Sequence, residues 1–446
     1  MKGIQKRLGS LLMAAVMLLC PAEAITYEPD FTPTSKAVYL ENLDTGLILY
    51  EKNADEKMYP ASLTKIMTAI VVLENVKDLD GETAEYPMWI QNMLYGTNAS
   101  LGGLIVGEEL TIRQLLTSAL VQSGNESAMI LAGYVGSGGM ADFMPRDITT
   151  FVEMMNDKAK ALGCTGTHFT NPTGLHSDNT YTTARDMAIM AKYAMQKSAF
   201  SSIVKNYAVQ LGQTNKHADL WQYSTNKMLL TSSPYYYAPV VGIKTGSTDE
   251  AGRCVISQAE DSGYHYFCVV MGSPVTAAEP YQNFIETRQL YRWAFGNFSL
   301  RTLLEQGELM AEVPVKYSGD GKVAKLAIKE DVVQLLRDDI SLDSIIYKAE
   351  LPEFVEAPIA AGDTVGKMHI MLMGEEIGTV ELVATQAFSL SWFRKALGSI
   401  GSLLSSTVAK VIFIVVVLAI AGYIVYAVRH NKKRKKHRSK YSDRNY

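Results

Sequence analysis

Two long apolar segments stand at the ends of the chain and differ from everything between them. The first, residues 8–19, follows three basic residues and ends shortly before Ala22-Glu23-Ala24. A basic start, a short apolar core and small residues at a cleavage position are typical of a secretory signal peptide. We therefore expect residues 1–24 to be removed and the mature chain to begin near Ile25.

The second apolar segment, Val411–Val428, has 18 residues without a charge. At about 1.5 Å per residue in a helix, it can cross most of the hydrocarbon core of a bilayer. We expect a transmembrane helix over 408–428, and before it a linker over 386–407 that forms an amphipathic helix at the membrane interface. The tail 429–446 is strongly basic and is predicted to stay in the cytoplasm, which places the rest of the mature chain outside.

Between these ends the hydrophobic pattern first alternates and then takes helical spacing. The alternation over 35–52, interrupted by Asp44-Thr45-Gly46, predicts a β-hairpin. Pro60 marks the start of the first helix, and Thr182 and Thr183 precede the last. Helices are predicted over 60–75, 110–122, 126–135, about 148–161 and 182–197.

After Pro239 the pattern changes to three β-rich runs, "PVVGIKTG", "AGRCVISQ" and "YHYFCVVMG", followed by a helix from about 280 to 295. Strands at the front, helices in the middle and strands behind predict one α+β domain over 25–298, whose terminal segments share a sheet. Beyond Leu300, short alternations with turns at 318–321 and 374–376 predict a small β-rich domain over 299–385.

Charge and cysteine content narrow the class of protein. The formal net charge is −4, but the two basic ends leave about −14 on the segment between them. This excess of acid argues against a nucleic-acid partner. Of the three cysteines in the mature chain, Cys254 and Cys268 flank a predicted turn at 261–263, so they form either a disulfide across a hairpin or two buried thiols.

Candidate chemistry begins at "MYPASLTKIM", where Ser62 and Lys65 open a strongly apolar helix. Three-residue spacing places both side chains on one helix face, and unpaired backbone N–H groups at the helix start can stabilise an oxyanion. Ser-x-x-Lys alone is a weak signal, because it recurs at Ser202 and Ser224. Without context, Ser62 is better explained as a helix-start residue and Lys65 as a surface lysine.

Two further motifs supply that context. Ser123-Gly124-Asn125 interrupts two predicted helices, and Lys244-Thr245-Gly246 follows an apolar strand. Ser-x-Asn recurs elsewhere, whereas Lys-Thr-Gly occurs once. A serine and lysine at a helix start, a serine and asparagine on a loop, and a lysine on a strand together fill the roles that acyl transfer needs.

In this order the motifs resemble those of the active-site serine penicillin-binding proteins, specifically the low-molecular-weight D-alanyl-D-alanine carboxypeptidases. The segments "YPASLTKIMTA", "SGNESA", "FTNPTGLHSDNTYTTARDMA" and "GIKTGST" carry the likeness over roughly residues 27 to 297. The part after 300 resembles the C-terminal domain of that family. The resemblance implies the transpeptidase fold shared by serine β-lactamases and penicillin-binding proteins.

The resemblance also implies roles for individual residues. Ser62 would be the nucleophile, Lys65 its base, and Ser123 a proton relay to the departing D-alanine. The substrate-binding residues would be Asn125 for an amide, Lys244 and Thr245 for the terminal carboxylate, and Gly246 and Ser247 on the same strand. The N–H groups of Ser62 and Ser247 would form the oxyanion hole. Expected partners are peptidoglycan stem peptides ending in D-Ala-D-Ala, β-lactams as inhibitors, and membrane lipid.

The sequence departs from the family pattern in two places, and there the family's side-chain roles cannot be carried over. Ser247 stands where many relatives carry an aromatic residue or histidine, and the stretch 273–280 has no lysine or arginine that could contact substrate. Five histidines outside the end segments lack zinc-peptidase spacing, and no phosphate-binding glycine loop occurs. We expect no metal and no cofactor, and interpret His176 with Asp178 as a polar loop.

Other functions use the same residues. A D,D-endopeptidase would cut cross-links with this site, and a β-lactamase would need an additional glutamate loop that we do not find. A β-lactam sensor or a non-catalytic wall-binding protein belongs to a different class. The 18-residue segment from Arg429 leaves no room for a signalling domain, and a dead homologue would be expected to lack one motif.

Overall fold

The computed structural model describes residues 27–397 and 407–442. The predicted signal peptide, part of the linker and the last four residues lie outside the described residues. The chain divides into two compact units. Unit 1 runs to Leu300 and takes in Leu335–Ile340, and unit 2 holds Arg301–Gln334 and the chain from Ser341 onward.

A five-stranded antiparallel sheet forms the centre of unit 1, in the order β2-β1-β9-β8-β7. The hairpin of β1 (Ala37–Asn42) and β2 (Ile48–Lys52) pairs through β1 with β9 (Tyr264–Ser273). β8 (Gly252–Asp261) follows, and β7 (Val240–Thr248) is the edge strand. The first and last strands of the domain therefore share one sheet, which confirms the prediction.

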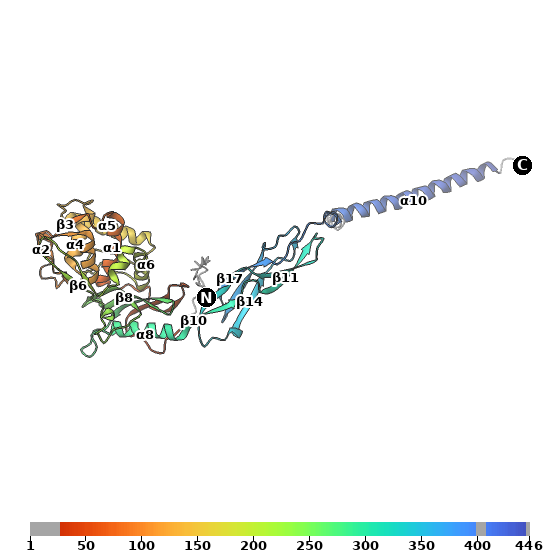
Figure 1. Cartoon of the computed structure of the whole chain (residues 1–446). Coiled ribbons are helices and arrows are strands. Elements are labelled where there is room, and N and C mark those ends of the chain that lie inside the picture. The colour runs from red at the N-terminus through yellow and green to blue at the C-terminus, as the bar shows by residue number, and fades with distance from the viewer. Residues whose placement is uncertain (1–26, 398–406, 443–446) are drawn as a thin grey trace, which may run out of the picture. The chain divides into compact units, whose positions relative to one another are not determined.

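Helices cover both faces of this sheet, as Figure 1 shows for α8 on one face and the helical layer on the other. Alternate side chains of the strands explain why: Ala37 and Tyr39 belong to the core under the helical layer, whereas Val38 and Leu40 pack with α8 (Gln282–Asn297). The sheet is thus buried on both sides, with two hydrophobic cores.

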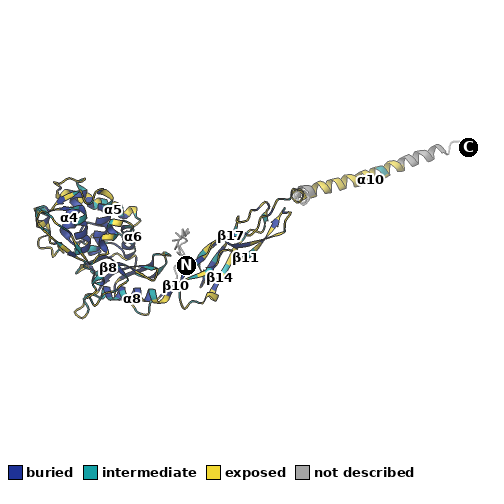
Figure 2. Ribbon diagram, viewed as in Figure 1, coloured by how far each residue is buried: buried dark blue, intermediate teal, exposed yellow. Residues whose placement is uncertain are grey.

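The helical layer surrounds α4 (Asn125–Gly136), which is buried from Asn125 to Val135 (Figure 2). Thr111 begins α3 with a capping box, Pro145 occupies the first turn of α5, and Thr183 caps α6. The other helices of unit 1 are α1 (Lys65–Asn75), α2 (Met88–Leu94), α3 (Ile112–Thr117), α5 (Pro145–Ala161), α6 (Ala184–Met195) and α7 (Ser198–Val204). Two short hairpins complete it: β3 (Thr83–Glu85) with β4 (Glu109–Thr111), and β5 (Ala208–Gln210) with β6 (Trp221–Tyr223).

Unit 2 is built on a six-stranded sheet in the order β14-β16-β17-β12-β11-β15. Its core contains buried apolar side chains such as Leu326, Ile370 and Leu382. Along the strands these alternate with side chains that are more exposed. The strands are β11 (Leu309–Lys316), β12 (Val323–Ile328), β14 (Ile345–Glu350), β15 (Val355–Glu356), β16 (Thr364–Leu372) and β17 (Glu375–Ala384). A separate pair joins β10 (Phe298–Leu304) to β13 (Val332–Arg337).

The last element is α10 (Thr407–Ser442), a single helix that continues beyond the predicted span. Its stretch Lys410–Lys432 is long and apolar enough to cross a membrane. In the described part of the predicted linker, Trp392 and Phe393 are both 76% exposed. The side chains predicted to face a membrane interface are Phe388, Trp392, Phe393 and Leu397. Leu397 is also exposed, but Phe388 is 1% exposed and forms a β-bridge with Ile359, so the prediction is wrong for Phe388.

The cysteines settle the alternative that the sequence left open, because all three described cysteines are free and buried. Cys254 packs in the core under the helical layer and Cys268 in the core under α8, so their side chains leave the sheet on opposite faces. In the register, Cys254 lies opposite Gly246 and Cys268 opposite Ser257. The two are buried thiols.

Candidate active site

Ser62 and Lys65 lie on a tighter turn than the sequence predicted. The predicted helix 60–75 begins as a 3₁₀ turn, Ala61–Thr64, and becomes α-helical only at Lys65. Three residues per turn stack positions i and i+3 directly. As a result the Lys65 Nζ lies 3.1 Å from the Ser62 Oγ, within hydrogen-bonding distance.

The Lys65 side chain is fully buried, which is rare for a lysine. Its ammonium donates to the Asn125 Oδ1 at 2.5 Å and to the Thr173 carbonyl oxygen at 2.8 Å. Burial lowers the pKa of Lys65 well below its usual value; the charge of Lys244 lowers it further, and Glu126 opposes the shift. This environment favours the neutral amine over the charged ammonium.

Ser123 contacts the second buried lysine, Lys244. α3 continues as a π-helix, Ser118–Gln122, and Ser123 ends it with φ +65°, a left-handed conformation that a non-glycine residue seldom adopts. The Lys244 Nζ donates to the Ser123 Oγ at 2.9 Å and to the Thr245 carbonyl at 2.9 Å. Burial lowers the pKa of Lys244 to about 7.

Glycines allow the backbones around Ser62 to meet. A Cβ on Gly246 would lie 2.9 Å from the Pro60 carbonyl oxygen and 3.1 Å from the Ser62 nitrogen. A Cβ on Gly174, whose φ is +80°, would lie 1.9 Å from the Ala61 carbonyl oxygen. β7 and the loop that contains Gly174 therefore hold the Ser62 turn between them.

The other copies of the weak motifs make no such arrangement. The Ser202 Oγ donates to the Ala199 carbonyl on the surface helix α7, and the Ser224 Oγ accepts from the Asn226 N–H. Neither serine has a hydrogen bond to the lysine three positions on, within the part of the chain that the structure describes. Only the Ser62 copy is joined to a buried lysine.

Three residues that sequence reasoning gave no role complete the site. The Thr173 carbonyl accepts from Lys65, and the Thr225 Oγ1 lies 2.5 Å from the Thr245 Oγ1. Glu126, buried beside Asn125, accepts from the Gly102 N–H at 2.6 Å, and burial raises its pKa. Glu126 lies in the segment "SGNESA" and Thr173 in "FTNPTGLHSDNTYTTARDMA", both of which resemble the family. Thr225 lies in none of these segments, so nothing in the sequence pointed to it.

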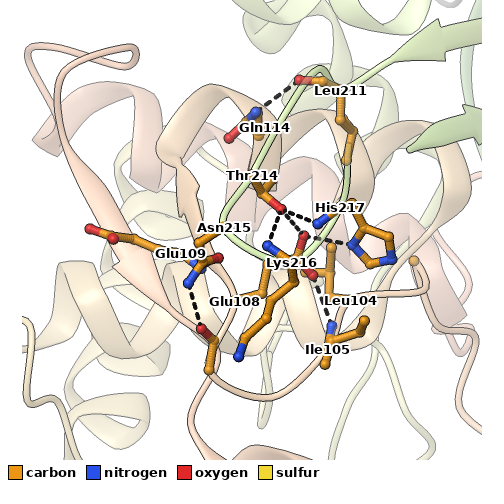
Figure 3. Close-up of polar contacts among 12 residues, drawn as sticks. Leu104, Ile105, Glu108, Glu109, Gln114, Leu211, Thr214, Asn215, Lys216 and His217 are labelled. Carbon is orange, nitrogen blue, oxygen red and sulfur yellow. Dashed lines mark hydrogen bonds and ion pairs between the residues drawn. The ribbon is translucent and has the colours of Figure 1, made fainter. Parts of the chain in front are cut away.

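The histidines form polar links and no metal centre. His176 lies 3.2 Å from Asp178, as expected of a polar loop. Glu108 accepts from the Thr214 Oγ1 at 2.6 Å and lies 2.8 Å from the His217 Nδ1, a contact that joins two loops (Figure 3). In the described residues no group of three or more histidine, cysteine or carboxylate side chains could hold a metal ion.

Comparison with known proteins identifies the class. A family model described as D-alanyl-D-alanine carboxypeptidase, peptidase family S11, matches residues 23–275. A model described as the C-terminal domain of penicillin-binding protein 5 matches 298–389. The chain belongs to the S11 family, whose members are low-molecular-weight penicillin-binding proteins, and this confirms the family that the motifs indicated.

Individual relatives support the same class. The D-alanyl-D-alanine carboxypeptidase DacF of Bacillus subtilis is 29% identical over 398 residues, which cover 87% of this chain and 96% of that protein. The D-alanyl-D-alanine carboxypeptidase of Streptomyces sp. strain K15 is 34% identical over 273 residues, covering 59% of this chain and 89% of that protein.

Solved structures confirm the predicted fold. Penicillin-binding protein 5 from Haemophilus influenzae is 26% identical, with a TM-score of 0.60, and the match covers 81% of this chain and 100% of that one. The Streptomyces K15 DD-transpeptidase is 30% identical, with a TM-score of 0.54, and the match covers 60% of this chain and 98% of that one.

Proposed function

We propose that this protein removes the terminal D-alanine from peptidoglycan stem peptides that end in D-Ala-D-Ala, through an acyl-enzyme on Ser62. Family membership and relatives along most of the chain support the reaction class. The observation that carries the assignment of the nucleophile is the hydrogen bond between the Ser62 Oγ and a fully buried lysine.

In acylation, the Ser62 Oγ attacks the carbonyl carbon of the penultimate D-alanine while Lys65 takes the hydroxyl proton. The backbone N–H groups of Ser62 and Ser247 are assigned to the oxyanion that forms. Ser123, whose hydroxyl accepts a hydrogen bond from Lys244, relays the proton that Lys65 has taken to the nitrogen of the departing D-alanine as the C–N bond breaks. Lys65 can serve as base because burial favours its neutral form.

The substrate is assigned to the free edge of β7. Asn125 binds a substrate amide, Lys244 and Thr245 face the terminal carboxylate, and Gly246 and Ser247 present backbone to an extended peptide. Water then attacks the ester, which releases the shortened peptide and returns the proton to Ser62. A β-lactam acylates the same oxygen, and its ester is hydrolysed slowly.

The test is D-alanine release from a diacylated Lys-D-Ala-D-Ala peptide by the full-length protein purified in detergent, compared with its Ser62→Ala variant. We expect the parent protein to release D-alanine and the variant to release none. The variant should also no longer be labelled by a fluorescent penicillin. A folded parent that releases no D-alanine would refute the carboxypeptidase function. Equal release by the variant would instead refute the assignment of Ser62.

The same acyl-enzyme can be attacked by an amine in place of water, which would join two peptides. The solved structure of a 30% identical relative is described as a DD-transpeptidase, so this second activity has a specific observation behind it. Adding glycine or a D-amino acid to the assay separates the two, because an acceptor-dependent product forms only by transfer.

We further propose that the Lys410–Lys432 stretch of α10 anchors the protein in the cytoplasmic membrane. The basic tail 429–446 is assigned to the cytoplasm by the positive-inside rule, and the catalytic domain 25–298 and the β-rich domain 299–385 to the outside. Protease added to intact protoplasts should digest both domains and leave a tag placed after Tyr446 untouched. Digestion of the tag would show that the C-terminal tail lies outside the cell, opposite to the proposed orientation.

A further inference from the structure

Arg253 lies on β8 directly beside the strand that carries Lys244-Thr245-Gly246, and the register places it opposite Ser247. Opposed residues of antiparallel strands project to the same face of a sheet. Cys254 packs under the helical layer and Val255 under α8, so Arg253, like Val255, projects on the α8 side. Its guanidinium carbon lies 4.9 Å from the ring centre of Tyr281, the residue before α8.

The Arg253 guanidinium lacks the anionic partner that such a group usually has. Its Nε is buried and has no hydrogen-bond partner, and no carboxylate of the described residues forms an ion pair with it. Leaving a buried charged donor unsatisfied costs free energy, so an unpaired donor on a guanidinium calls for an external acceptor. Arginine presents its donors in a planar fork that matches a carboxylate.

A second cation converges on the same ring. The Lys227 Nζ lies 4.8 Å from the ring centre of Tyr281, and Lys227 too forms no ion pair among the described residues. The carboxylate of Glu279 is engaged by the Tyr235 hydroxyl and the Tyr281 N–H. Two positive charges that contact one aromatic ring without an anion repel each other, and a bound anion would relieve that repulsion.

This place borders the edge of β7 that is assigned to substrate. Thr245 projects on the α8 side with Arg253, and its hydroxyl is bonded to Thr225, two residues before Lys227. Lys244 projects to the other face and already donates to Ser123 and to the Thr245 carbonyl. A second, permanently charged group on the Thr245 side is therefore available to a terminal carboxylate, although 273–280 supplies no basic side chain.

We infer that Arg253 binds the terminal carboxylate of the substrate peptide beside Thr245, with Lys227 adding a second positive charge. This inference rests on the proposed carboxypeptidase function and names the residue that selects peptides with a free C-terminal carboxylate. Arg253 is a binding residue: it takes no proton and makes no bond to the reacting carbonyl.

The test compares two substrates of the full-length protein in detergent: diacylated Lys-D-Ala-D-Ala and its C-terminal amide, which lacks the negative charge. The measured quantity is the ratio of kcat/KM for the acid to kcat/KM for the amide. A charge-assisted hydrogen bond corresponds to roughly a ten- to hundredfold preference, so Arg253→Gln should lower the ratio by that factor through kcat/KM for the acid. Arg253→Lys should restore part of it.

Arg292→Gln is the matched control, because Arg292 also lies over a tyrosine ring, 5.8 Å from Tyr237, but on the exposed side of α8. We expect it to leave the ratio unchanged. An unchanged ratio in Arg253→Gln, or an equal loss on both substrates, would overturn the inference and leave the proposed function intact. If Arg253→Gln fails to fold, Lys227→Gln provides the test, because the inference requires that its ratio of kcat/KM for the acid to kcat/KM for the amide also falls.

A parent protein that releases nothing from the acid would refute the proposed function, and the inference would fall with it. A parent that cleaves acid and amide equally well would refute only the role of Arg253. The thermal unfolding midpoint of each variant, measured alongside, separates a change in selectivity from a change in stability.

Discussion

The two units of this protein differ in whether they bury charged side chains. Unit 1 buries two lysines, Lys65 and Lys244, together with Glu126. Among the described residues of unit 2, the only buried polar side chain is Ser318. Its ion pairs lie at the surface, as in Lys329 with Glu381, whose side chains are 52% and 42% exposed.

This difference distinguishes the unit that contains the candidate active site from the unit that does not. Burying an ammonium is unfavourable, and the penalty appears as a lowered pKa for both lysines. The described residues of unit 2 do not carry that penalty, because they bury no charged side chain. In unit 1 the penalty has a use under the proposed function, since a lysine with a lowered pKa can act as a base.

The largest effect is expected when the buried lysine is removed. Lys65→Met should slow acylation of Ser62 by a fluorescent penicillin at least about a hundredfold, because Lys65 is the only group among the described residues that forms a hydrogen bond with the Ser62 hydroxyl. Lys205→Met is the matched control, since Lys205 belongs to the surface copy of Ser-x-x-Lys. In this variant, Ser62 should be acylated at the normal rate. Equal labelling of the two variants would contradict the role of Lys65.

The next effect concerns the backbone around Ser62. Gly174→Ala should destabilise unit 1 by roughly 2–4 kcal/mol, since its Cβ would combine a left-handed strain with an overlap on the Ala61 carbonyl. Gly138→Ala has a similar φ, +79°, but open space around the Cβ, so it should cost only about 1 kcal/mol. Urea unfolding followed by tryptophan fluorescence measures both, and equal losses would show that the overlap relaxes.

The pH dependence of stability should reveal the buried charge of Lys244. Its folded pKa of about 7 lies below the unfolded value, so between pH 7 and 10 the unfolded chain binds more protons. Stability should therefore rise with pH in that window by at most about 1.4 kcal/mol per unit.

Lys244→Met provides the test for that slope. The variant should be more stable than the parent at pH 6, and the difference should shrink by pH 9 as the parent sheds its proton. Thermal unfolding at the two pH values measures it. A difference that stays constant with pH would mean that Lys244 keeps its charge in the folded protein.

The smallest effect is expected in unit 2, with the opposite sign. Hydrogen bonds that the His369 ring donates to Glu350 and Glu376 raise the pKa of His369, so any stabilisation is present at low pH and is lost as pH rises through the raised value. His369 is partly exposed and water screens it, so His369→Gln should change the unfolding midpoint only slightly at pH 5 and not at pH 8. A larger change in the unfolding midpoint at pH 8 than at pH 5 would contradict the expected direction of this pH dependence.

Much of this protein follows from local pattern. The strands on both sides of the helices, the β-rich second unit and the apolar C-terminal helix were predictable, because alternation and helical spacing are local properties. Details that depend on packing were not. The 3₁₀ turn at Ser62 and the π-helix before Ser123 replace predicted α-helix at the two points where the site needs a side chain displaced.

The sequence by itself determined which chemistry is present: Ser62 with Lys65, Ser123 with Asn125, and Lys244 with Thr245 are visible as motifs, and their order identifies the family. Only the tertiary structure decided what those groups can do. The surrounding chain buries the two lysines and so shifts their pKa values, and it brings Thr225 into contact with Thr245 and places Arg253 opposite Ser247 on the neighbouring strand. Desolvation and convergence depend on neighbours far apart in sequence, so no spacing along the chain could reveal them.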